Sequence, residues 1–258
     1  MGFIAFMTDW GYTHYVAQAK AVIYRVYPQS EIIDITHNIP HFDIRAGMHI
    51  LYRIHKDFPE GTVFLAVVDP GVGTQRKAIV GKFGEYYFVA PDNGIMSMIL
   101  RDYPDAEVYS IENREYFYLK EPTYTFHGRD IFAPVAAHIL RGVALDKFGS
   151  KVENPVMLDV FKPKWDGRHL KVEVAYVDDF GNVQLYLKDL PWDEKQYPQV
   201  WVRGFRAKLV KAYGDVPAGT MIFHRESSGF WELAVSGGNA GEALRVKSGD
   251  IIEIIPVD

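Results

Sequence analysis

Hydrophobic positions in the first half of the chain alternate between short continuous runs and longer stretches with helical spacing. The runs, which are typical of buried strands, cover residues 3–7, 32–35, 63–68 and 87–90. The stretches with helical spacing include residues 15–27 and 43–55, and Asp43 is suited to cap the second of them. Short strands separated by helices indicate a mostly parallel sheet that is covered by helices on both faces.

Polar residues follow each of these runs. They are Asp9 after the first run, Thr36 and His37 after the second, Asp69 after the third, and Asp92 and Asn93 after the fourth. Because ligands bind beyond the carboxyl ends of the strands in open parallel sheets, these residues are expected to meet at one edge of the sheet. Each residue could instead cap the helix or turn that follows it, and for one residue alone that is the simpler interpretation.

The pattern changes after residue 150. Residues 151–168 contain two prolines and lack periodicity, which predicts a linker, and the later runs are β-rich with few helical stretches. Turn sequences such as 179–182 and 236–239 separate these runs, as in a small antiparallel barrel or sandwich. We therefore divide the chain into an α/β domain at residues 1–155, a linker at 156–168 and a β-rich domain at 169–258.

Composition indicates a globular protein and removes several classes of function. The 258 residues are 48% hydrophobic and 24% charged, and the net charge of −5 disfavours nonspecific binding to nucleic acid or anionic membranes. The chain has no cysteine, which excludes disulfides, thiolate metal sites and cysteine nucleophiles. No apolar run is long enough to span a membrane, and the apolar N-terminus lacks the basic region of a signal peptide, so we expect a cytoplasmic protein.

The segment from Asp69 to Arg76 combines an acid at a strand end, a glycine-rich turn and an arginine seven residues later. If the turn folds back, the guanidinium reaches the carboxylate and keeps it ionised. Spacing alone is equally compatible with a catalytic group and with an ion pair that braces the turn. The segment lacks the Lys-Ser/Thr ending of a P-loop, so phosphate binding is disfavoured.

A histidine next to a glycine, His127-Gly128, stands just ahead of a helical stretch. Histidine transfers protons near neutral pH, and the glycine leaves room for a group to approach the backbone. The structural alternative is a histidine that bonds a nearby carbonyl at the start of a helix. Asp and His at strand ends could also bind a divalent metal, although the histidines form no H-E-x-x-H or other strict metal motif.

In the second half of the chain, Asp178, Phe180 and Asn182 lie in one glycine-containing turn. Their carboxylate, aromatic ring and amide can together hydrogen-bond the edge of a purine and stack on its face. A hairpin turn explains the same sequence without a ligand. The same two alternatives hold for the turns at residues 227–230 and 238–240.

Six short segments occur in an order that resembles one known family. They are Phe6-Met7-Thr8-Asp9, Asp34-Ile35-Thr36-His37, Val68-Asp69-Pro70-Gly71-Val72-Gly73-Thr74 with Arg76, Ala90-Pro91-Asp92-Asn93-Gly94, Phe126-His127-Gly128-Arg129-Asp130 and Asp179-Phe180-Gly181-Asn182. Over nearly its whole length the chain resembles the SAM hydroxide adenosyltransferases, which are adenosine-forming hydrolases of S-adenosyl-L-methionine (SAM) related to SAM-dependent fluorinases and chlorinases. The resemblance implies an N-terminal Rossmann-like domain, with a mostly parallel sheet and helices on both faces, and a C-terminal antiparallel β-barrel. It also implies a homotrimer that holds SAM between the N-terminal domain of one subunit and the C-terminal domain of the next, with SAM as substrate and no cofactor.

The resemblance further implies roles for particular residues. Asp69, Arg76 and His127 match the family's set that handles the water, which attacks the ribose C5′ carbon and releases adenosine and methionine. Asp9 matches the carboxylate that grips the ribose hydroxyls. Other substrate contacts are expected at Phe42, Asn93, Phe126, Asp178, Phe180, Asn182, Ser227, Asn239 and Ala240.

Two differences from known relatives bear on the chemistry. The halogenases carry tyrosine at the positions of Asp69 and His127, and a halide-binding serine where this chain has Gly128. A carboxylate would repel a halide and no hydroxyl remains to hold one, so water is the expected nucleophile. Many family members also have an acidic residue shortly after the first strand, where this chain has Thr13-His14-Tyr15. The sequence therefore does not identify the residue that binds the amino-acid end of SAM.

Three rival functions keep part of this pattern. A SAM or adenosine sensor would use the pocket without catalysis, and a SAM-dependent halogenase would need a halide for turnover. A metal-dependent hydrolase would lose activity with a chelator, and its metal ligands would be Asp9, His37, Asp69 and His127. Our expectation is a SAM hydrolase without a metal site.

Overall fold

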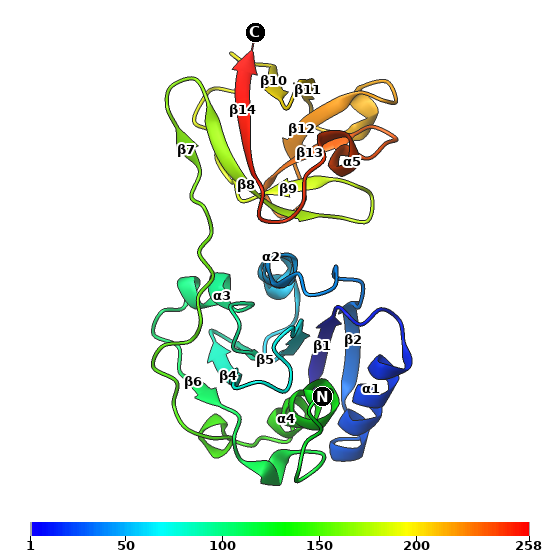
Figure 1. Ribbon diagram of the computed structural model, residues 1–258, viewed down its shortest axis with the longest axis vertical. Helices are drawn as coiled ribbons and strands as arrows, with labels where there is room; N and C mark the ends of the chain where they lie inside the picture. The colour runs from blue at the N-terminus through cyan, green and yellow to red at the C-terminus, as the bar shows by residue number, and fades with distance from the viewer. Residues whose placement is uncertain (1, 258) are drawn as a thin grey trace. The chain divides into compact units, whose positions relative to one another are not determined.

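The computed structural model describes residues 2–257 and divides the chain into two compact units, Met1–Leu158 and Asp159–Asp258 (Figure 1). The break lies within the stretch without periodicity, and part of that stretch, β7 (Lys164–Trp165), pairs with the second unit. Trp165 packs on the apolar core of that unit and contacts Trp192, with ring centres 5.3 Å apart. A strand of two residues is too short to show a period of its own.

The first unit is built on a six-stranded sheet with the strand order β2-β1-β3-β5-β4-β6. The strands are β1 (Phe3–Thr8), β2 (Glu31–Thr36), β3 (Val63–Val67), β4 (Ala78–Phe83), β5 (Tyr86–Pro91) and β6 (Val108–Ser110). β1, β2, β3 and β5 run parallel, whereas β4 is antiparallel to β5 and β6. The prediction of a mostly parallel sheet is therefore confirmed.

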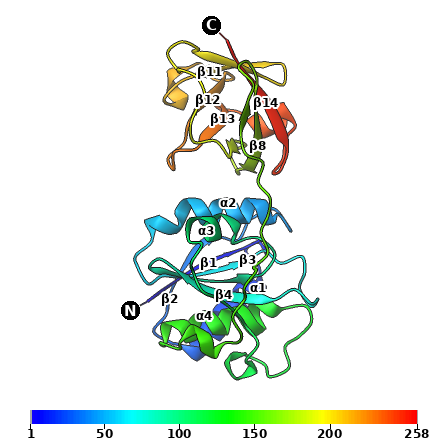
Figure 2. The same ribbon diagram turned by 90° about the vertical axis from the view of Figure 1, so that its left-hand side faces the viewer.

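Helices cover both faces of this sheet. One face carries α2 (Ile44–Ile54) and α3 (Ser97–Asp102), and the other carries α1 (His14–Val26) and α4 (Ala133–Leu140) (Figure 2). Shorter helical turns are η1 (His55–Asp57), η2 (Arg114–Tyr116), the π-helical η3 (Gly128–Phe132) and η4 (Leu145–Lys147). Asp43 caps α2 as predicted, because its side chain accepts a hydrogen bond from the Ala46 amide at 2.9 Å. Among the helices of residues 2–257, none is both long enough and apolar enough to cross a membrane.

The core of the first unit explains the continuous apolar runs. All five residues of β3 are buried, because this strand lies inside a sheet that is covered on both faces. On one face its side chains join Phe6 of β1 with Phe132 and Val135 in a single apolar cluster. β1 and β3 pair in parallel up to Thr8 and Val67, so the segments that follow the two strands begin side by side.

The second unit is a closed β-barrel. Besides β7 it contains β8 (Leu170–Val177), β9 (Val183–Leu185), β10 (Gln199–Val202), β11 (Phe205–Leu209), η5 (Tyr213–Asp215), β12 (Met221–Arg225), β13 (Trp231–Val235), α5 (Ala240–Leu244) and β14 (Ile251–Val257). β14 pairs with both β10 and β8, which closes the order β14-β10-β11-β12-β13-β9-β8 into a ring with β7 added on β8. The pairings are antiparallel except that of β11 with β12, which is parallel. Of the two architectures that the sequence left open, the barrel is the observed one.

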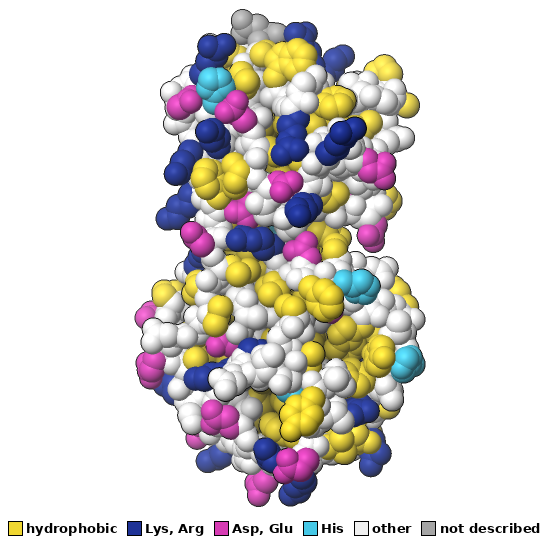
Figure 3. All heavy atoms as spheres, viewed as in Figure 1, with side chains coloured by type: hydrophobic (Ala, Val, Ile, Leu, Met, Phe, Trp, Pro, Cys, Tyr) yellow, Lys and Arg dark blue, Asp and Glu magenta, His cyan; other side chains and the backbone are white. Residues whose placement is uncertain are grey.

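Charged side chains of both signs lie on the face of the protein that Figure 3 shows. On the face in Figure 3, lysine and arginine side chains are interspersed with aspartate and glutamate on each unit. This mixture agrees with the small negative net charge of −5. A surface of mixed sign attracts polyanions only weakly.

Candidate active site

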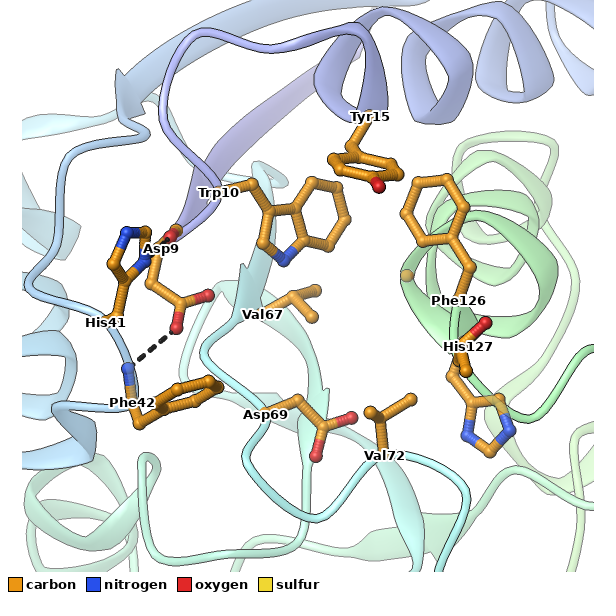
Figure 4. A pocket seen from close by; sticks show the side chains of 12 residues that line it. Asp9, Trp10, Tyr15, His41, Phe42, Val67, Asp69, Val72, Phe126 and His127 are labelled. Atoms are coloured by element: carbon orange, nitrogen blue, oxygen red, sulfur yellow. Dashed lines mark hydrogen bonds between the residues drawn. The ribbon is translucent and has the colours of Figure 1, made fainter.

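A pocket of about 290 Å³ opens beyond the carboxyl ends of β1 and β3 (Figure 4). Its lining combines acidic, aromatic and histidine side chains: Asp9, Trp10, Tyr15, His41, Phe42, Val67, Asp69, Val72, Thr125, Phe126, His127 and Gly128. Asp9 follows β1 and Asp69 follows β3. The parallel pairing of these two strands therefore brings both carboxylates to one pocket, as the strand ends predicted.

Arg76 joins Asp69 and His127 into one hydrogen-bonded group at this pocket. Its Nε donates to Oδ1 of Asp69 at 2.8 Å, and its Nη2 donates to Oδ2 of the same carboxylate. The same Nη2 lies 3.1 Å from Nδ1 of His127. The guanidinium also stacks on the ring of Phe132, 5.1 Å from its centre. The turn after Asp69 thus folds back as predicted, and the structure brings the three expected residues together.

The contact with Arg76 determines where the imidazole of His127 carries its proton. A guanidinium is a donor only, so Nδ1 of His127 must be the acceptor and the ring proton must be on Nε2. Burial lowers the pKa of His127, and the charge of Arg76 lowers it further, so the ring is neutral near pH 7. The ring nitrogen that remains available to a ligand is therefore a hydrogen-bond donor.

Glycine is required where the turn after Asp69 bends. Gly73 has a φ of +75°, and a Cβ at this position would lie 2.2 Å from the carbonyl oxygen of Tyr124. The turn therefore packs directly against the segment that leads to His127. This close approach keeps the two halves of the hydrogen-bonded group in contact.

Gly128 accommodates the indole of Trp10. A Cβ at position 128 would lie 2.2 Å from that ring. Trp10 contacts Phe126 edge to face with ring centres 5.3 Å apart, and Phe126 contacts Tyr15 in the same way at 5.2 Å. Trp10, Phe126 and Tyr15 thus form an aromatic wall of the pocket (Figure 4). The close approach to Gly128 that the sequence predicted is made by the protein's own tryptophan.

Asp9 is held by the loop that precedes α2. Its Oδ2 accepts a hydrogen bond from the Phe42 amide at 2.8 Å, and its carbonyl oxygen lies 2.7 Å from Nδ1 of His41. Burial raises the pKa of the Asp9 carboxyl above its ordinary value. Phe42 is 67% exposed and has a φ of +67°, a left-handed conformation that is strained for an aromatic residue. The second oxygen of Asp9 is turned toward the pocket (Figure 4).

The polar residues His37, after β2, and Asn93, after β5, do not line this pocket. His37 is fully buried, with Nδ1 2.9 Å from Oγ1 of Thr8. Asn93 donates to the Val68 carbonyl at 2.8 Å and accepts from the Ile95 amide at 3.2 Å, so its side chain braces the backbone. Across residues 2–257, no three His, Asp or Glu side chains gather as ligands for one metal ion. The four ligands of the metal-dependent rival are thus not brought to one point.

A second cavity, of about 530 Å³, shares part of its wall with the first. It is lined by Trp10, His14, Tyr15, Gln18, Thr123, Thr125, Phe126 and Arg129. His14 lies in the first turn of α1. This is the part of the chain in which many family members carry an acidic residue. This lining contains a basic side chain and no acidic one.

In the second unit, Asp178 organises the turn that the sequence singled out. Its Oδ1 accepts from the amides of Phe180 and Asn182 at 3.0 and 2.8 Å, and its Oδ2 accepts from the Asn182 side chain at 3.0 Å. Gly181 has a φ of +81°, and a Cβ there would lie 2.2 Å from the side chain of Asn239. The turn therefore packs against Asn239 at the start of α5, and the Gly241 amide donates to the Gly181 carbonyl at 2.9 Å.

This turn borders a pocket of about 430 Å³ that is lined by Phe180, Asn182, Tyr213, Val235, Gly237 and Gly238. Phe180 is 81% exposed. Asn239 caps α5 by accepting from the Glu242 amide at 2.8 Å, and Ala240 is fully buried. Ser227 lies on the turn between β12 and β13 and is not among the residues that line this pocket.

Several of the lining residues stand in no motif that the sequence alone makes visible. Trp10 and His41 adjoin the selected Asp9 and Phe42, so proximity to those residues was the available signal. Tyr213 carries no comparable signal. Its hydroxyl donates to the buried Glu232 at 2.8 Å, and only the closure of the barrel brings its ring to the pocket.

Comparison with known proteins gives one consistent match. Residues 4–149 match the SAM hydroxide adenosyltransferase N-terminal domain, and residues 172–253 match the C-terminal domain of the same family. A protein from Salinispora tropica named (R)-S-adenosyl-L-methionine hydrolase is 37% identical over 262 residues, which cover 97% of each chain. A crystal structure of an uncharacterized conserved protein from Thermotoga maritima is 49% identical, with a TM-score of 0.90 over 98% of this chain and 99% of that one. A fluorinase from Actinoplanes sp. is 27% identical over 62% of each chain.

Proposed function

Because this chain belongs to the SAM hydroxide adenosyltransferase family, we propose that it hydrolyses SAM to adenosine and L-methionine. The observation that carries the proposal is the hydrogen-bonded group of Asp69, Arg76 and His127 at a pocket beyond the strand ends. It offers a carboxylate, a fixed cation and an imidazole N–H to a water molecule.

The reaction is a displacement at the ribose C5′ carbon. The oxygen of water attacks C5′, the C5′–S bond breaks, and its electron pair stays on sulfur, so methionine leaves as a neutral thioether. The leaving group needs no proton, whereas the attacking water must lose one. Holding the water in line with the C5′–S bond supplies much of the rate, and a positioned base adds about 10²–10⁴-fold.

Asp69 is the proton acceptor in this mechanism. Nδ1 of His127 is occupied by Arg76 and Nε2 carries a proton, so the neutral ring has no lone pair free for the proton of water. Each oxygen of Asp69 keeps a lone pair beside its bond to Arg76. His127 donates its Nε2–H to the oxygen of water, and Arg76 keeps both partners in place.

Water suits this pocket better than a halide. The carboxylate of Asp69 repels an anion, and Gly128 has no hydroxyl to hold one. A serine at position 128 would collide with Trp10, because a Cβ there would already lie 2.2 Å from the indole. These features favour hydrolysis over halogenation.

The rest of the substrate contacts other groups in this proposal. The free oxygen of Asp9 accepts hydrogen bonds from the ribose hydroxyls, and Phe42 covers the sugar. In the barrel, the turn of Phe180 and Asn182 binds the adenine. Following the family resemblance, the N-terminal unit of one subunit and the barrel of the next form each site of a homotrimer. The cysteine-free composition suits the cytoplasm, where we expect the enzyme to act.

The sulfonium of SAM is a stereocentre, so two epimers exist at sulfur. The methyl group and the amino-acid chain occupy exchanged positions on sulfur in the two epimers. A pocket that aligns the C5′–S bond of one epimer with the water therefore binds the transition state of the other epimer less tightly. The Salinispora tropica relative is named for the (R) epimer. We extend this preference to the present chain.

Product analysis tests this function. The purified protein is incubated with each epimer of SAM, with and without a chelator, chloride or fluoride, and the products are identified by mass spectrometry. We expect adenosine and methionine in equal amounts, formed faster from the (R) epimer and unchanged by chelator or halide. Binding without product would indicate a sensor, loss with chelator a metal enzyme, and a halogenated nucleoside a halogenase, and each result contradicts the proposal.

A further inference from the structure

Four linked side chains lead from the surface to the end of β1, and the mechanism above uses none of them. Nζ of Lys20 lies 2.5 Å from Oδ2 of Asp34. Oδ1 of Asp34 lies 3.1 Å from Nε2 of His37, and Nδ1 of His37 lies 2.9 Å from Oγ1 of Thr8. We refer to Lys20, Asp34, His37 and Thr8 as the Thr8 relay. It connects α1 and β2 with the last residue of β1.

The inner half of the relay is fully buried and its outer half meets solvent. Thr8 and His37 have no exposed surface, whereas the side chains of Lys20 and Asp34 are 28% and 29% exposed. Burial lowers the pKa of His37 more than Asp34 raises it, so the ring is neutral. Burial raises the pKa of Asp34, but the hydrogen bond from Lys20 and the neighbouring His37 ring lower it by more and keep this carboxyl ionised.

One set of proton positions satisfies the relay. Nε2 of His37 makes no regular hydrogen bond within residues 2–257, and the ionised Asp34 at 3.1 Å attracts the ring proton to this nitrogen. Nδ1 of His37 is then an acceptor and takes the hydroxyl proton of Thr8. With its proton directed away, the Thr8 oxygen accepts from the Trp10 amide at 3.2 Å. Each member therefore orients the next.

The relay ends on both sides of Asp9. Thr8 precedes this residue and Trp10, which the Thr8 hydroxyl holds, follows it. The carbonyl oxygen of His37 also accepts from the Gly11 amide at 2.7 Å. His37 therefore fixes the segment around Asp9 at two points, through its ring and through its backbone.

We propose that Asp34 and His37 are positioning residues that act through Thr8 to set the Asp9 carboxylate against the substrate ribose. This inference rests on the proposed function of the pocket. A role confined to stability would lower the amount of folded protein and leave its affinity unchanged. A positioning role lowers the affinity of the folded protein for the nucleoside.

The first test compares two substitutions of Thr8. Thr8→Val removes the hydroxyl at nearly constant shape, and Thr8→Ser keeps the hydroxyl. We expect Thr8→Val to raise the Kd for adenosine and the KM for SAM about tenfold, with a smaller change in kcat per folded molecule. Thr8→Ser should stay within about threefold of the wild type in all three values. Equal adenosine affinities for the two variants would overturn the proposal.

The second test changes Asp34 in the outer half of the Thr8 relay. It shows whether the relay affects the affinity for adenosine even if Thr8→Val does not fold. Asp34→Asn keeps the size of the side chain and removes its charge, and Glu31→Gln makes the same change on an exposed side chain of the same strand. We expect Asp34→Asn to raise the adenosine Kd about fivefold or more and Glu31→Gln to leave it unchanged. Equal values for the two variants contradict the relay.

These measurements separate the relay from the function on which it rests. A wild-type protein that binds adenosine but makes none from SAM contradicts the proposed function, while the adenosine Kd still reports on the relay. A wild-type protein that does not bind adenosine overturns both.

Discussion

At the residue scale, the pocket depends on side chains whose protonation is set by their neighbours. Burial and Arg76 keep His127 neutral, and burial raises the pKa of Asp9. The sequence pointed to Asp69, Arg76 and His127, but their spacing was equally compatible with a catalytic site and with an ion pair that braces the turn. Only the geometry shows that Arg76 occupies Nδ1 of His127, because spacing along the chain carries no information on which ring nitrogen faces which partner.

Substitution of Asp69 tests its role as proton acceptor. Asp69→Asn keeps the shape of the side chain and removes its basicity, so we expect kcat to fall about 10²–10⁴-fold. The adenosine Kd should change less than about threefold, because the nucleoside is held elsewhere. Single-turnover kinetics and calorimetry measure the two values, with the surface variant Asp57→Asn as control. Near-wild-type turnover in Asp69→Asn would assign the proton to another group.

The donor role of His127 predicts a difference between two substitutions. The amide of His127→Gln can donate a hydrogen bond to water, whereas the side chain of His127→Leu cannot. We expect the Gln variant to keep a kcat about tenfold or more above that of the Leu variant. If His127 were instead the base, both variants would lose the same function and turn over equally slowly.

The raised pKa of Asp9 predicts weaker nucleoside binding in acid. The ribose hydroxyls need the ionised carboxylate, and this form is lost as the pH falls through a pKa that lies above the ordinary value of 3.8. Calorimetry across the acidic range measures the Kd for adenosine. As the pH is lowered, this Kd should begin to increase while the pH is still above 3.8. Asp9→Asn should bind weakly at every pH and lose this dependence; an unchanged pH profile in that variant would contradict the assignment.

At the scale of elements, the sequence predicted the buried strands well and the special contacts poorly. The runs of β1, β3 and β5 were recognisable because strands covered on both faces are largely apolar. The edge strand β2 was recognisable from its isoleucines, although it contains Glu31 and Asp34 and is only partly buried. Local pattern gave no sign of the parallel pairing of β11 with β12, which depends on the connection between them. It also could not tell that Asp9 faces the pocket while His37 is buried away from it, because the direction of a side chain at a strand end is set by the loop that follows.

The contact between η3 and Trp10 predicts the effect of a serine at position 128. Gly128→Ser forces the indole of Trp10 to move, because a Cβ there would lie 2.2 Å from the ring. We expect a loss of about 1–3 kcal/mol in the free energy of unfolding and reduced hydrolysis, without a halogenated product in chloride. Gly214→Ser, where a Cβ meets nothing within 4 Å, is the matched control for thermal melting and product analysis. Equal melting of the two variants would contradict the packing argument.

At the scale of the whole molecule, the proposed site needs residues from both units. Asp69 and Asp9 belong to the first unit, and Phe180 and Asn182 belong to the barrel. The strand pattern was sufficient to separate an α/β half from a β-rich half. It was not sufficient to show how subunits combine, since local periodicity reports burial within one chain and not the partner across an interface.

Mixing two inactive variants tests the shared sites of the proposed trimer. Chains with Asp69→Asn keep an intact barrel, and chains with both Phe180→Ala and Asn182→Ala keep an intact first unit. If each site combines units from neighbouring subunits, co-expressed chains should recover about a quarter of the wild-type sites. Capture through a tag on one variant shows that the other variant is in the same trimer, sedimentation measures the size of that trimer, and the specific activity measures recovery. Mixed trimers without recovered activity would contradict the shared site.

In the proposed reaction, water held by Asp69 and His127 attacks the C5′ carbon of SAM. Incubation of the purified protein with SAM in ¹⁸O-labelled water, followed by mass spectrometry of the nucleoside, tests this directly. We expect one ¹⁸O atom in the 5′-hydroxyl group of adenosine for every methionine released. Adenosine without the label, or a nucleoside that carries chlorine or fluorine at C5′, would contradict it.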